Sequence, residues 1–118
     1  MTENKRQIGA KMESMAFEFL QEKGIRIINR NFTCRLGEID LIGLHKGTLV
    51  FFEVKYRSSV KSGLPEEAVN AKKQNNICRV ADYYRMKYHV AENISCRFDV
   101  VAILGDKISW YKNAFEYC

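Results

Sequence analysis

The apolar positions near the N-terminus recur at intervals of three and four residues, which predicts a helix over residues 5–23. Gly24 follows as a plausible helix stop. Gly9 lies inside this pattern, where glycine costs about 1 kcal/mol relative to alanine, so we expect a close approach to the backbone there. The apolar face of this helix consists of Ile8, Met12, Met15, Ala16, Phe19 and Leu20.

Beyond Gly24 the pattern changes to short runs rich in β-branched and aromatic residues, which are typical of strands. We predict strands at residues 24–31, 38–44 and 48–57, with a turn at residues 45–47 between the second and the third. The third run, TLVFFEVKYR, is the most strongly patterned.

The second half of the chain starts with a polar loop at residues 58–64. Pro65 suits the first turn of a helix that runs to about Tyr88. A fourth strand is predicted at residues 97–104 and a shorter fifth strand at residues 107–111. This order predicts an α/β fold with a mixed sheet: an antiparallel hairpin, then a strand that returns after a helical crossover.

Length and composition narrow the class of protein. The chain has 118 residues, of which 47% are hydrophobic and 28% charged, so we expect one globular domain over residues 1–118. No apolar run approaches the ~20 residues of a membrane span, and the N-terminus lacks the pattern of a signal peptide. We therefore expect a cytoplasmic protein with no membrane partner.

The charge and the cysteines bear on partners and metals. A net charge of +5 favours polyanionic partners such as nucleic acid. The four cysteines form no CxxC pair and the two histidines stand alone, which argues against a zinc site and favours reduced thiols.

The charged end of the predicted hairpin is the most informative part of the sequence. With residues 46–47 at the centre of the turn, Asp40 lies opposite Glu53 and Glu38 lies opposite Lys55. Nearer the turn both faces of these strands are apolar, which indicates burial on both sides.

Two facing carboxylates repel each other, and burial raises the cost of keeping both ionised. A bound cation would relieve that repulsion, and carboxylate oxygens suit Mg²⁺. The ammonium group of Lys55 could then orient a metal-bound water. The alternative is a solvated sheet edge, where Glu38 pairs with Lys55 and Asp40 lies beside Glu53 by chance.

The segments GEIDLI and LVFFEVKYR resemble the PD-(D/E)XK signature of restriction-endonuclease-like nucleases, with Asp40 as the first acid and Glu53-Val54-Lys55 as the E-x-K element 13 residues later. Ile39 stands where the written signature has proline, which is not a ligand. Over nearly its full length the chain resembles the YraN-like family of small bacterial proteins, which is similar to archaeal Holliday junction resolvases. The matching segments are Gly9-x-x-x-Glu13, Arg30-Asn31-Phe32, Gly37-Glu38-Ile39-Asp40-Leu41-Ile42, Phe52-Glu53-Val54-Lys55-x-Arg57, Ala68-Val69-x-x-x-Lys73-Gln74 and Arg97-Phe98-Asp99-Val100-Val101.

The resemblance implies a restriction-endonuclease-like fold, with an α-β-β-β-α-β core and a mixed central sheet flanked by helices. It implies Mg²⁺ or Mn²⁺ held by Asp40, Glu53 and the Val54 carbonyl, with Lys55 aligning the attacking water. A helix glutamate, Glu13, is expected near the metal, where an ordinary solvated glutamate is the alternative. Glu38 is either a further ligand or, as we prefer, an orienting group that holds Lys55.

The predicted function is metal-dependent hydrolysis of nucleic-acid phosphodiesters, on DNA rather than RNA, with branched DNA such as a Holliday junction as the substrate implied by the resemblance. A homodimer is a further expectation from that resemblance. The sequence also leaves open a non-catalytic nucleic-acid-binding module and a scaffold protein with a residual site. Candidate phosphate contacts, which could equally be a solvated face, are Arg57, Lys72, Lys73 and Gln74.

Two features outside the hairpin have a structural interpretation. Arg97 and Asp99 are expected to form a buried ion pair. The aromatic residues near the C-terminus are expected to belong mainly to the core, with a dimer surface or a base-stacking platform as alternatives. They are Trp110, Tyr111, Phe115 and Tyr117.

Overall fold

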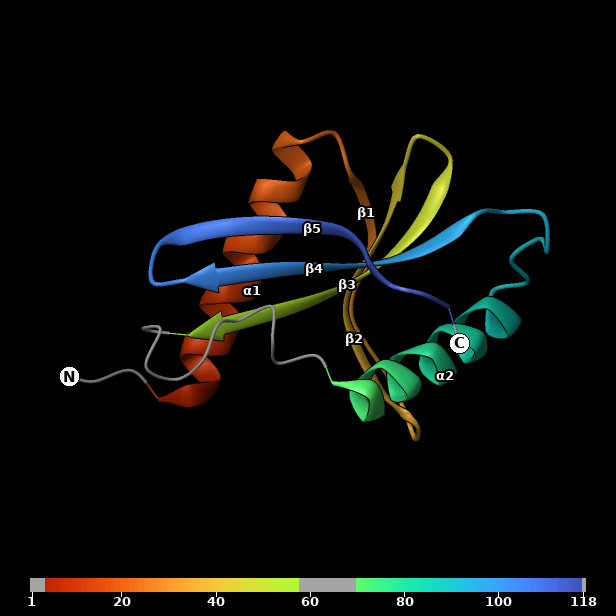
Figure 1. Ribbon diagram of the computed structural model, residues 1–118, viewed down its shortest axis with the longest axis horizontal. Helices are drawn as coiled ribbons and strands as arrows, with labels where there is room; N and C mark the ends of the chain where they lie inside the picture. Colours follow the sequence, from red (N-terminus) through yellow and green to blue (C-terminus); the bar gives the residue numbers. More distant parts are fainter. Residues whose placement is uncertain (1–3, 58–69, 118) are drawn as a thin grey trace.

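The computed structural model describes residues 4–57 and 70–117, which form two helices and five strands (Figure 1). In chain order these elements are α1 (Lys5–Glu22), β1 (Arg26–Cys34), β2 (Gly37–His45), β3 (Thr48–Arg57), α2 (Ala71–Lys87), β4 (Cys96–Leu104) and β5 (Lys107–Phe115).

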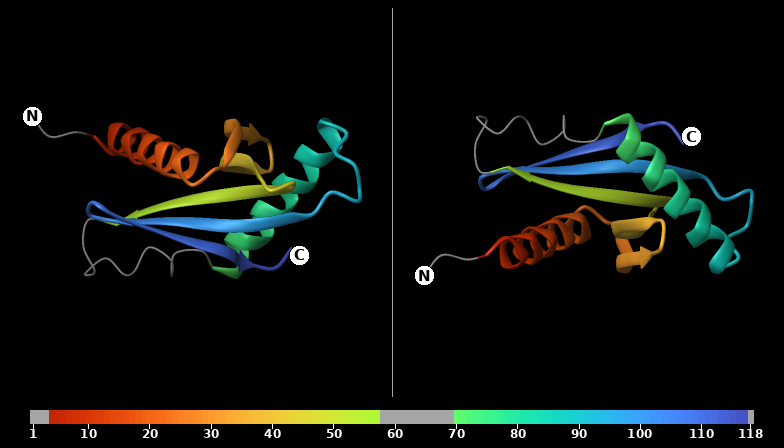
Figure 2. Two further views of the ribbon diagram at one scale, coloured as in Figure 1. Left: turned by 90° about the horizontal axis from the view of Figure 1, so that it is seen from above. Right: turned by 90° about the horizontal axis from the view of Figure 1, so that it is seen from below.

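The five strands form one sheet in the order β1-β2-β3-β4-β5. Strands β3 and β4 are parallel, and the other neighbours are antiparallel. The crossover between the parallel strands contains α2, and the two helices cover opposite faces of the sheet (Figure 2). The prediction of an α/β fold with a mixed sheet is therefore confirmed.

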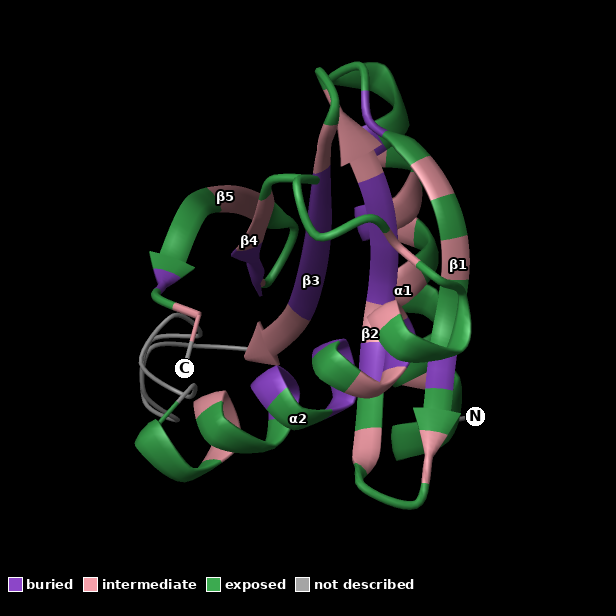
Figure 3. Cartoon of the chain, turned by 90° about the vertical axis from the view of Figure 1, so that its right-hand side faces the viewer, coloured by how far each residue is buried: buried purple, intermediate pink, exposed green. Residues whose placement is uncertain are grey.

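Each helix covers its own apolar core, and the most buried strands are the central ones (Figure 3). Under α1, the side chains of Met12, Ala16 and Leu20 pack against β2, β3 and β4. Under α2, the side chains of Ile77, Val80 and Tyr84 pack against the other face of the same strands. Burial on both faces explains why β3 has so few polar positions before Glu53.

Most predicted boundaries agree with the structure. The third strand has the predicted bounds, and the turn before it has φ of 51° at Lys46 and 83° at Gly47, a left-handed pair that suits a tight hairpin. Gly24 has φ of 89°, as expected of a helix stop. Strand β5 continues past the predicted end at Tyr111 to Phe115.

The structure bears on the expectations for Gly9 and for the second helix, whereas residues 58–69 lie outside the described part of the chain. Apart from its chain neighbours and the backbone of its own helix, no atom of the described residues comes within 4 Å of a Cβ built on Gly9, so the described part of the chain does not supply the expected close approach. The helix predicted to run without a break from Pro65 was wrong at residue 70: Asn70 has an extended backbone, and its side chain caps α2 by accepting from the backbone N–H of Lys73. The predicted helix start at Pro65 and the loop at residues 58–64 lie outside the described residues.

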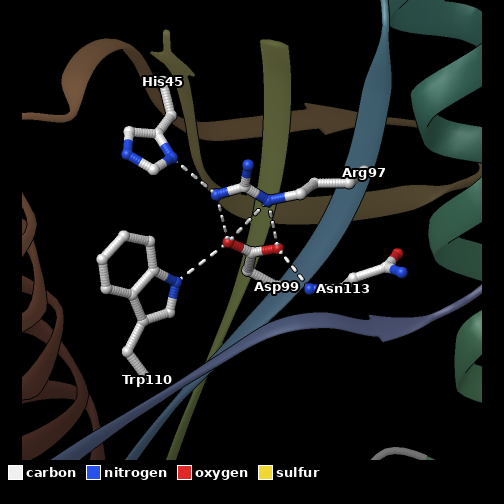
Figure 4. A network of polar contacts seen from close by, with 5 residues as sticks. All are labelled: His45, Arg97, Asp99, Trp110 and Asn113. Atoms are coloured by element: carbon white, nitrogen blue, oxygen red, sulfur yellow. Dashed lines mark hydrogen bonds and ion pairs between the residues drawn. The ribbon is translucent and has the colours of Figure 1, made fainter.

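A buried carboxylate ties β4 to β5 (Figure 4). Asp99 is fully buried and accepts hydrogen bonds from Arg97 Nε at 3.0 Å, Trp110 Nε1 at 2.9 Å and the backbone N–H of Asn113 at 2.9 Å. Arg97 also lies 2.9 Å from His45 Nδ1. The expected buried Arg97–Asp99 pair is confirmed.

The aromatic C-terminal segment divides between core and surface. Trp110 packs at the edge of the core under α1, whereas Phe115 and Tyr117 belong to the core under α2. Tyr111 is exposed. The interpretation as core therefore holds for three of these four rings.

Two further findings concern the described residues, 4–57 and 70–117. Neither helix there is long and apolar enough to cross a membrane. Cys34 and Cys96 are free thiols.

We expect Asp99→Ala to lower the free energy of unfolding by about 3–5 kcal/mol, because it leaves the half-buried guanidinium group of Arg97 and two N–H donors without their acceptor. Urea denaturation measures this change. Asp106→Ala, in the exposed β4–β5 turn, is the matched control and should change stability little. Equal effects of the two substitutions would show that the Asp99 network contributes nothing to stability.

Candidate active site

Strands β2 and β3 separate at the position where the acidic residues begin. Their pairing follows the predicted register from the turn to the pair Leu41–Phe52, where the recorded ladder ends. Ile39 belongs to the core under α2, but Leu41 belongs to the core under α1. Residues two apart in a regular strand share a face, so β2 twists sharply between them. On β1 the intervening position is Asn31, whose φ is 52°.

The side chain of Asp40 fills the opening between the two strands. The backbone N–H of Val54 donates a hydrogen bond of 2.8 Å to Asp40 Oδ2. The carboxylate thus takes the place of a backbone carbonyl from β2. This bond fixes the Asp40 side chain beside β3, close enough to Glu53 for the two charges to interact.

Burial is the main reason that the pKa of Asp40 rises from 3.8 to about 7, and the charge of Glu53 is the next. Glu13 and Glu38 raise this pKa further, whereas the hydrogen bond from Val54 lowers it. The predicted repulsion between Asp40 and Glu53 is therefore present in the structure.

Glu53 is buried, with 7% of its side chain exposed, and two lysines approach the same oxygen atom. Lys55 Nζ lies 3.2 Å from Glu53 Oε1, and Lys73 Nζ lies 3.3 Å from it. Burial is the largest single effect and lowers the pKa of Lys73, but the charge and hydrogen bond of Glu53, together with the charge of Asp40, raise it above its ordinary value. Two cations thus compensate one buried carboxylate.

The contact of Lys73 with Glu53 is a feature that sequence reasoning missed, because it placed this lysine among the phosphate contacts. Lys73 is the third residue of α2, and its backbone N–H bonds to the N-cap residue Asn70. The neighbouring Lys72 is exposed. Recognition of Asn70 as the N-cap would have fixed the phase of the helix and separated these two lysines.

The predicted pairing of Glu38 with Lys55 was wrong. Glu38 is exposed and lies opposite Thr33 of β1. The ion pair of Lys55 is instead with Glu53. The physical reason is the twist of β2 between Ile39 and Leu41, which takes Glu38 out of register with β3.

Glu13 reaches the same region from α1. Burial raises its pKa, a hydrogen bond from Asn31 and the charge of Arg30 lower it, and the charges of Glu38 and Glu53 raise it. Its Oε1 atom is buried without a hydrogen-bond partner in the described part of the chain. Glu13 is therefore more than a solvated helix residue.

The remaining predicted residues lie near the end of β3 and the start of α2. Arg57 is half-buried, and its Nη1 donates to the carbonyl of Tyr56 at 2.9 Å. Lys72 is exposed and Gln74 is half-buried. No measured contact in the structure tests their predicted role in phosphate binding.

The donor set is compatible with a hard divalent cation. One oxygen of Asp40 is engaged by Val54 and one oxygen of Glu53 by the lysines, which leaves one further oxygen on each acid. Magnesium binds through one or two carboxylates and keeps several waters. Within residues 4–57 and 70–117, no group of three or more His, Cys, Asp or Glu side chains is placed to hold a metal ion. A metal here would therefore need the Val54 carbonyl, water or substrate oxygens as well.

We expect the metal-free protein to lose stability as the pH rises from about 4 to about 7. In this window the folded state holds a proton on Asp40 that the unfolded chain releases, so ionisation of Asp40 favours unfolding. The loss should be on the order of 3–4 kcal/mol. Urea denaturation in a chelating buffer at several pH values measures it.

Asp40→Asn should remove most of this pH dependence, because the amide oxygen still accepts from Val54 but carries no titratable proton. Glu18→Gln, on the exposed side of α1, serves as the control and should retain the wild-type profile. If Asp40→Asn and the wild type have the same pH profile, Asp40 is not the group responsible.

The comparisons with known proteins agree over nearly the whole chain. Residues 12–103 match the model of a family described as "Uncharacterised protein family UPF0102". A UPF0102 protein of Lachnoclostridium phytofermentans is 46% identical over 96% of both chains. A UPF0102 protein of Caldicellulosiruptor bescii is 46% identical over 95% of this chain and 99% of its own, and one of Legionella pneumophila is 38% identical over 98% of both. These matches show that the chain belongs to the UPF0102 family.

Proposed function

We propose that this protein is a metal-dependent nuclease that hydrolyses nucleic-acid phosphodiesters on a restriction-endonuclease-like fold. The observation that carries the proposal is the half-buried Asp40 and the buried Glu53 at the opening between β2 and β3, with the ammonium group of Lys55 beside Glu53. A buried carboxylate whose pKa is raised by its neighbours is typical of functional sites. The order of elements and the mixed sheet support the proposed fold.

Asp40, Glu53 and the Val54 carbonyl would hold Mg²⁺ or Mn²⁺. The bound ion would polarise the scissile phosphate and lower the pKa of a coordinated water. Asp40 needs to be ionised for this role. Its raised pKa in the metal-free protein supports a site whose charge awaits a cation.

Lys55 would orient the attacking water. Its ammonium group carries three donors and no acceptor, so it can hold a water oxygen or a phosphate oxygen in place. Only 19% of its side chain is exposed, and Glu53 fixes its position at 3.2 Å. A lysine held in this way loses little conformational freedom when the substrate binds.

Glu13, on α1, would supply a further carboxylate near the cation. Glu38 would add negative charge at the exposed edge of the site. The preferred substrate is DNA, recognised by shape and charge rather than by sequence. Branched DNA and a homodimeric protein are proposals that rest on the resemblance to Holliday junction resolvases.

Labelled junction, flap and linear DNA should be cleaved in the presence of Mg²⁺ or Mn²⁺ and remain intact in chelator. Asp40→Asn, Glu53→Gln and Lys55→Met should each lower the cleavage rate by at least about 10²-fold, the size expected for loss of a group that acts on the reacting atoms. Glu18→Gln, exposed on α1, should cleave as the wild type does.

Two outcomes would contradict the proposal that this protein is a nuclease. Salt-sensitive binding of DNA without cleavage under any metal would favour a binding module on the same fold. Cleavage that survives all three substitutions would point to a contaminating enzyme.

Lys73→Met should bind Mn²⁺ several-fold more tightly than the wild type. The lysine competes with a cation for Glu53, and its loss removes a positive charge 3.3 Å from that carboxylate. Lys72→Met removes the same charge from the next residue, which is exposed, and should change the affinity less. Titration calorimetry measures both variants, and equal affinities would remove Lys73 from the site.

A further inference from the structure

A groove runs along the N-terminal half of α1, on the face of the sheet opposite α2. Its volume is about 690 Å³, which lies in the range of ligand-binding pockets. Helix α1 supplies one wall with Lys5, Arg6, Gly9 and Glu13, and β1 and β2 supply the other with Arg30 and Glu38.

One part of this groove is lined by acids of the candidate active site. Glu13 and Glu38 line the groove, and the charges of both raise the pKa of Asp40. In Figures 1 and 2 the C-terminal end of β3 lies beside the N-terminal half of α1. A ligand in the groove would therefore contact Glu13 and Glu38 and lie next to the candidate active site.

The cations in the groove are available for an anion. Lys5 and Arg6 are exposed and form no ion pair or hydrogen bond through their side chains in the described residues. Arg30 is already positioned: its guanidinium lies 4.4 Å from the centre of the Phe17 ring, and its Nη2 lies 3.4 Å from Ser14 Oγ. Stacking on a ring leaves the outer edge of a guanidinium free to donate.

Gly9 keeps the groove open. It has ordinary helical geometry, since its φ is not positive, and a Cβ there would meet nothing within 4 Å. The fold therefore does not require glycine at this position, although glycine weakens a helix relative to other residues. A side chain at residue 9 would project into the groove.

We propose that this groove binds a strand of nucleic acid, with Lys5, Arg6 and Arg30 contacting its backbone phosphates and Gly9 providing room for the strand. This surface lies on the α1 face, whereas the phosphate contacts predicted from the sequence lie at the end of β3 and on α2. The inference rests on the proposed function for the identity of the ligand, but the binding does not require metal or cleavage.

The test measures binding of a fluorescein-labelled single strand of about 12 thymidine nucleotides by anisotropy, in EDTA and over a series of salt concentrations. Lys5→Ala/Arg6→Ala should bind at least several-fold more weakly at low salt. The slope of log affinity against log salt should fall by about 1.4, because each contact to a single strand contributes about 0.7. The control Lys23→Ala/Lys87→Ala removes two exposed lysines near the C-terminal ends of the two helices and should retain the wild-type slope.

Gly9→Leu separates a role in binding from a role in folding. Leucine favours the helix and meets no atom within 4 Å at its Cβ, so the melting temperature should equal or exceed that of the wild type. The leucine side chain should nonetheless weaken binding several-fold by filling the groove. A structural role for Gly9 would give the opposite result in the melting experiment.

Three results would each refute the proposal that the groove binds a nucleic-acid strand. The Lys5→Ala/Arg6→Ala variant could keep the affinity and salt slope of the wild type, or Gly9→Leu could bind the strand as tightly as the wild type. The wild type could also fail to bind the strand at low salt. Metal-dependent cleavage is assayed separately. If the groove variants weaken binding but the wild type cleaves nothing, the proposed nuclease activity is refuted and the proposed binding in the groove stands. If the wild type cleaves DNA but the groove variants bind as the wild type does, the proposed binding in the groove is refuted and the nuclease activity stands.

Discussion

The hydrogen bond from the Val54 backbone to Asp40 joins the fold to the candidate site. Where β2 twists away, the N–H of a residue in the central strand β3 has lost its ladder partner, and a buried unpaired N–H costs about 1–3 kcal/mol. A carboxylate supplies the missing acceptor. The sheet therefore needs an acceptor at residue 40, and the acid is held in a place where its own ionisation is disfavoured. Structure and chemistry constrain the same side chain.

The same opening lets both helices reach one set of charges. Glu13 comes from α1 and Lys73 from α2, on opposite faces of the sheet, and each interacts with Glu53. In a closed sheet the backbone and side chains between two helices would screen such groups from each other. Burial, and after it the charge of Glu53, raises the pKa of Asp40 to about 7, and the charges of Glu13 and Glu38 add to this shift.

Sequence patterns predicted the mixed sheet, and the turn at Lys46-Gly47 predicted the hairpin register, because the length of a tight turn fixes which residues of two strands pair. That register placed Asp40, Glu53 and Lys55 at the end of the hairpin, where charges next to an apolar stretch need an explanation. Sequence patterns failed at Glu38, because a twist between Ile39 and Leu41 leaves no mark in a pattern of apolar and polar residues. They also missed the contact of Lys73 with Glu53, which depends on how the crossover helix lies against the sheet.

The buried Asp99 and the half-buried Asp40 show how a structural acid differs from a candidate functional one. Asp99 accepts from a guanidinium group, an indole and a backbone N–H, so its charge is satisfied by groups that are fixed in place. Asp40 accepts one recorded hydrogen bond, from Val54, and faces three other carboxylates. A network like that of Asp99 contributes to stability, whereas the surroundings of Asp40 work against it. Fold stability alone would favour a neutral acceptor at residue 40, and this conflict between stability and ionisation is the physical ground for the proposal that a cation binds there.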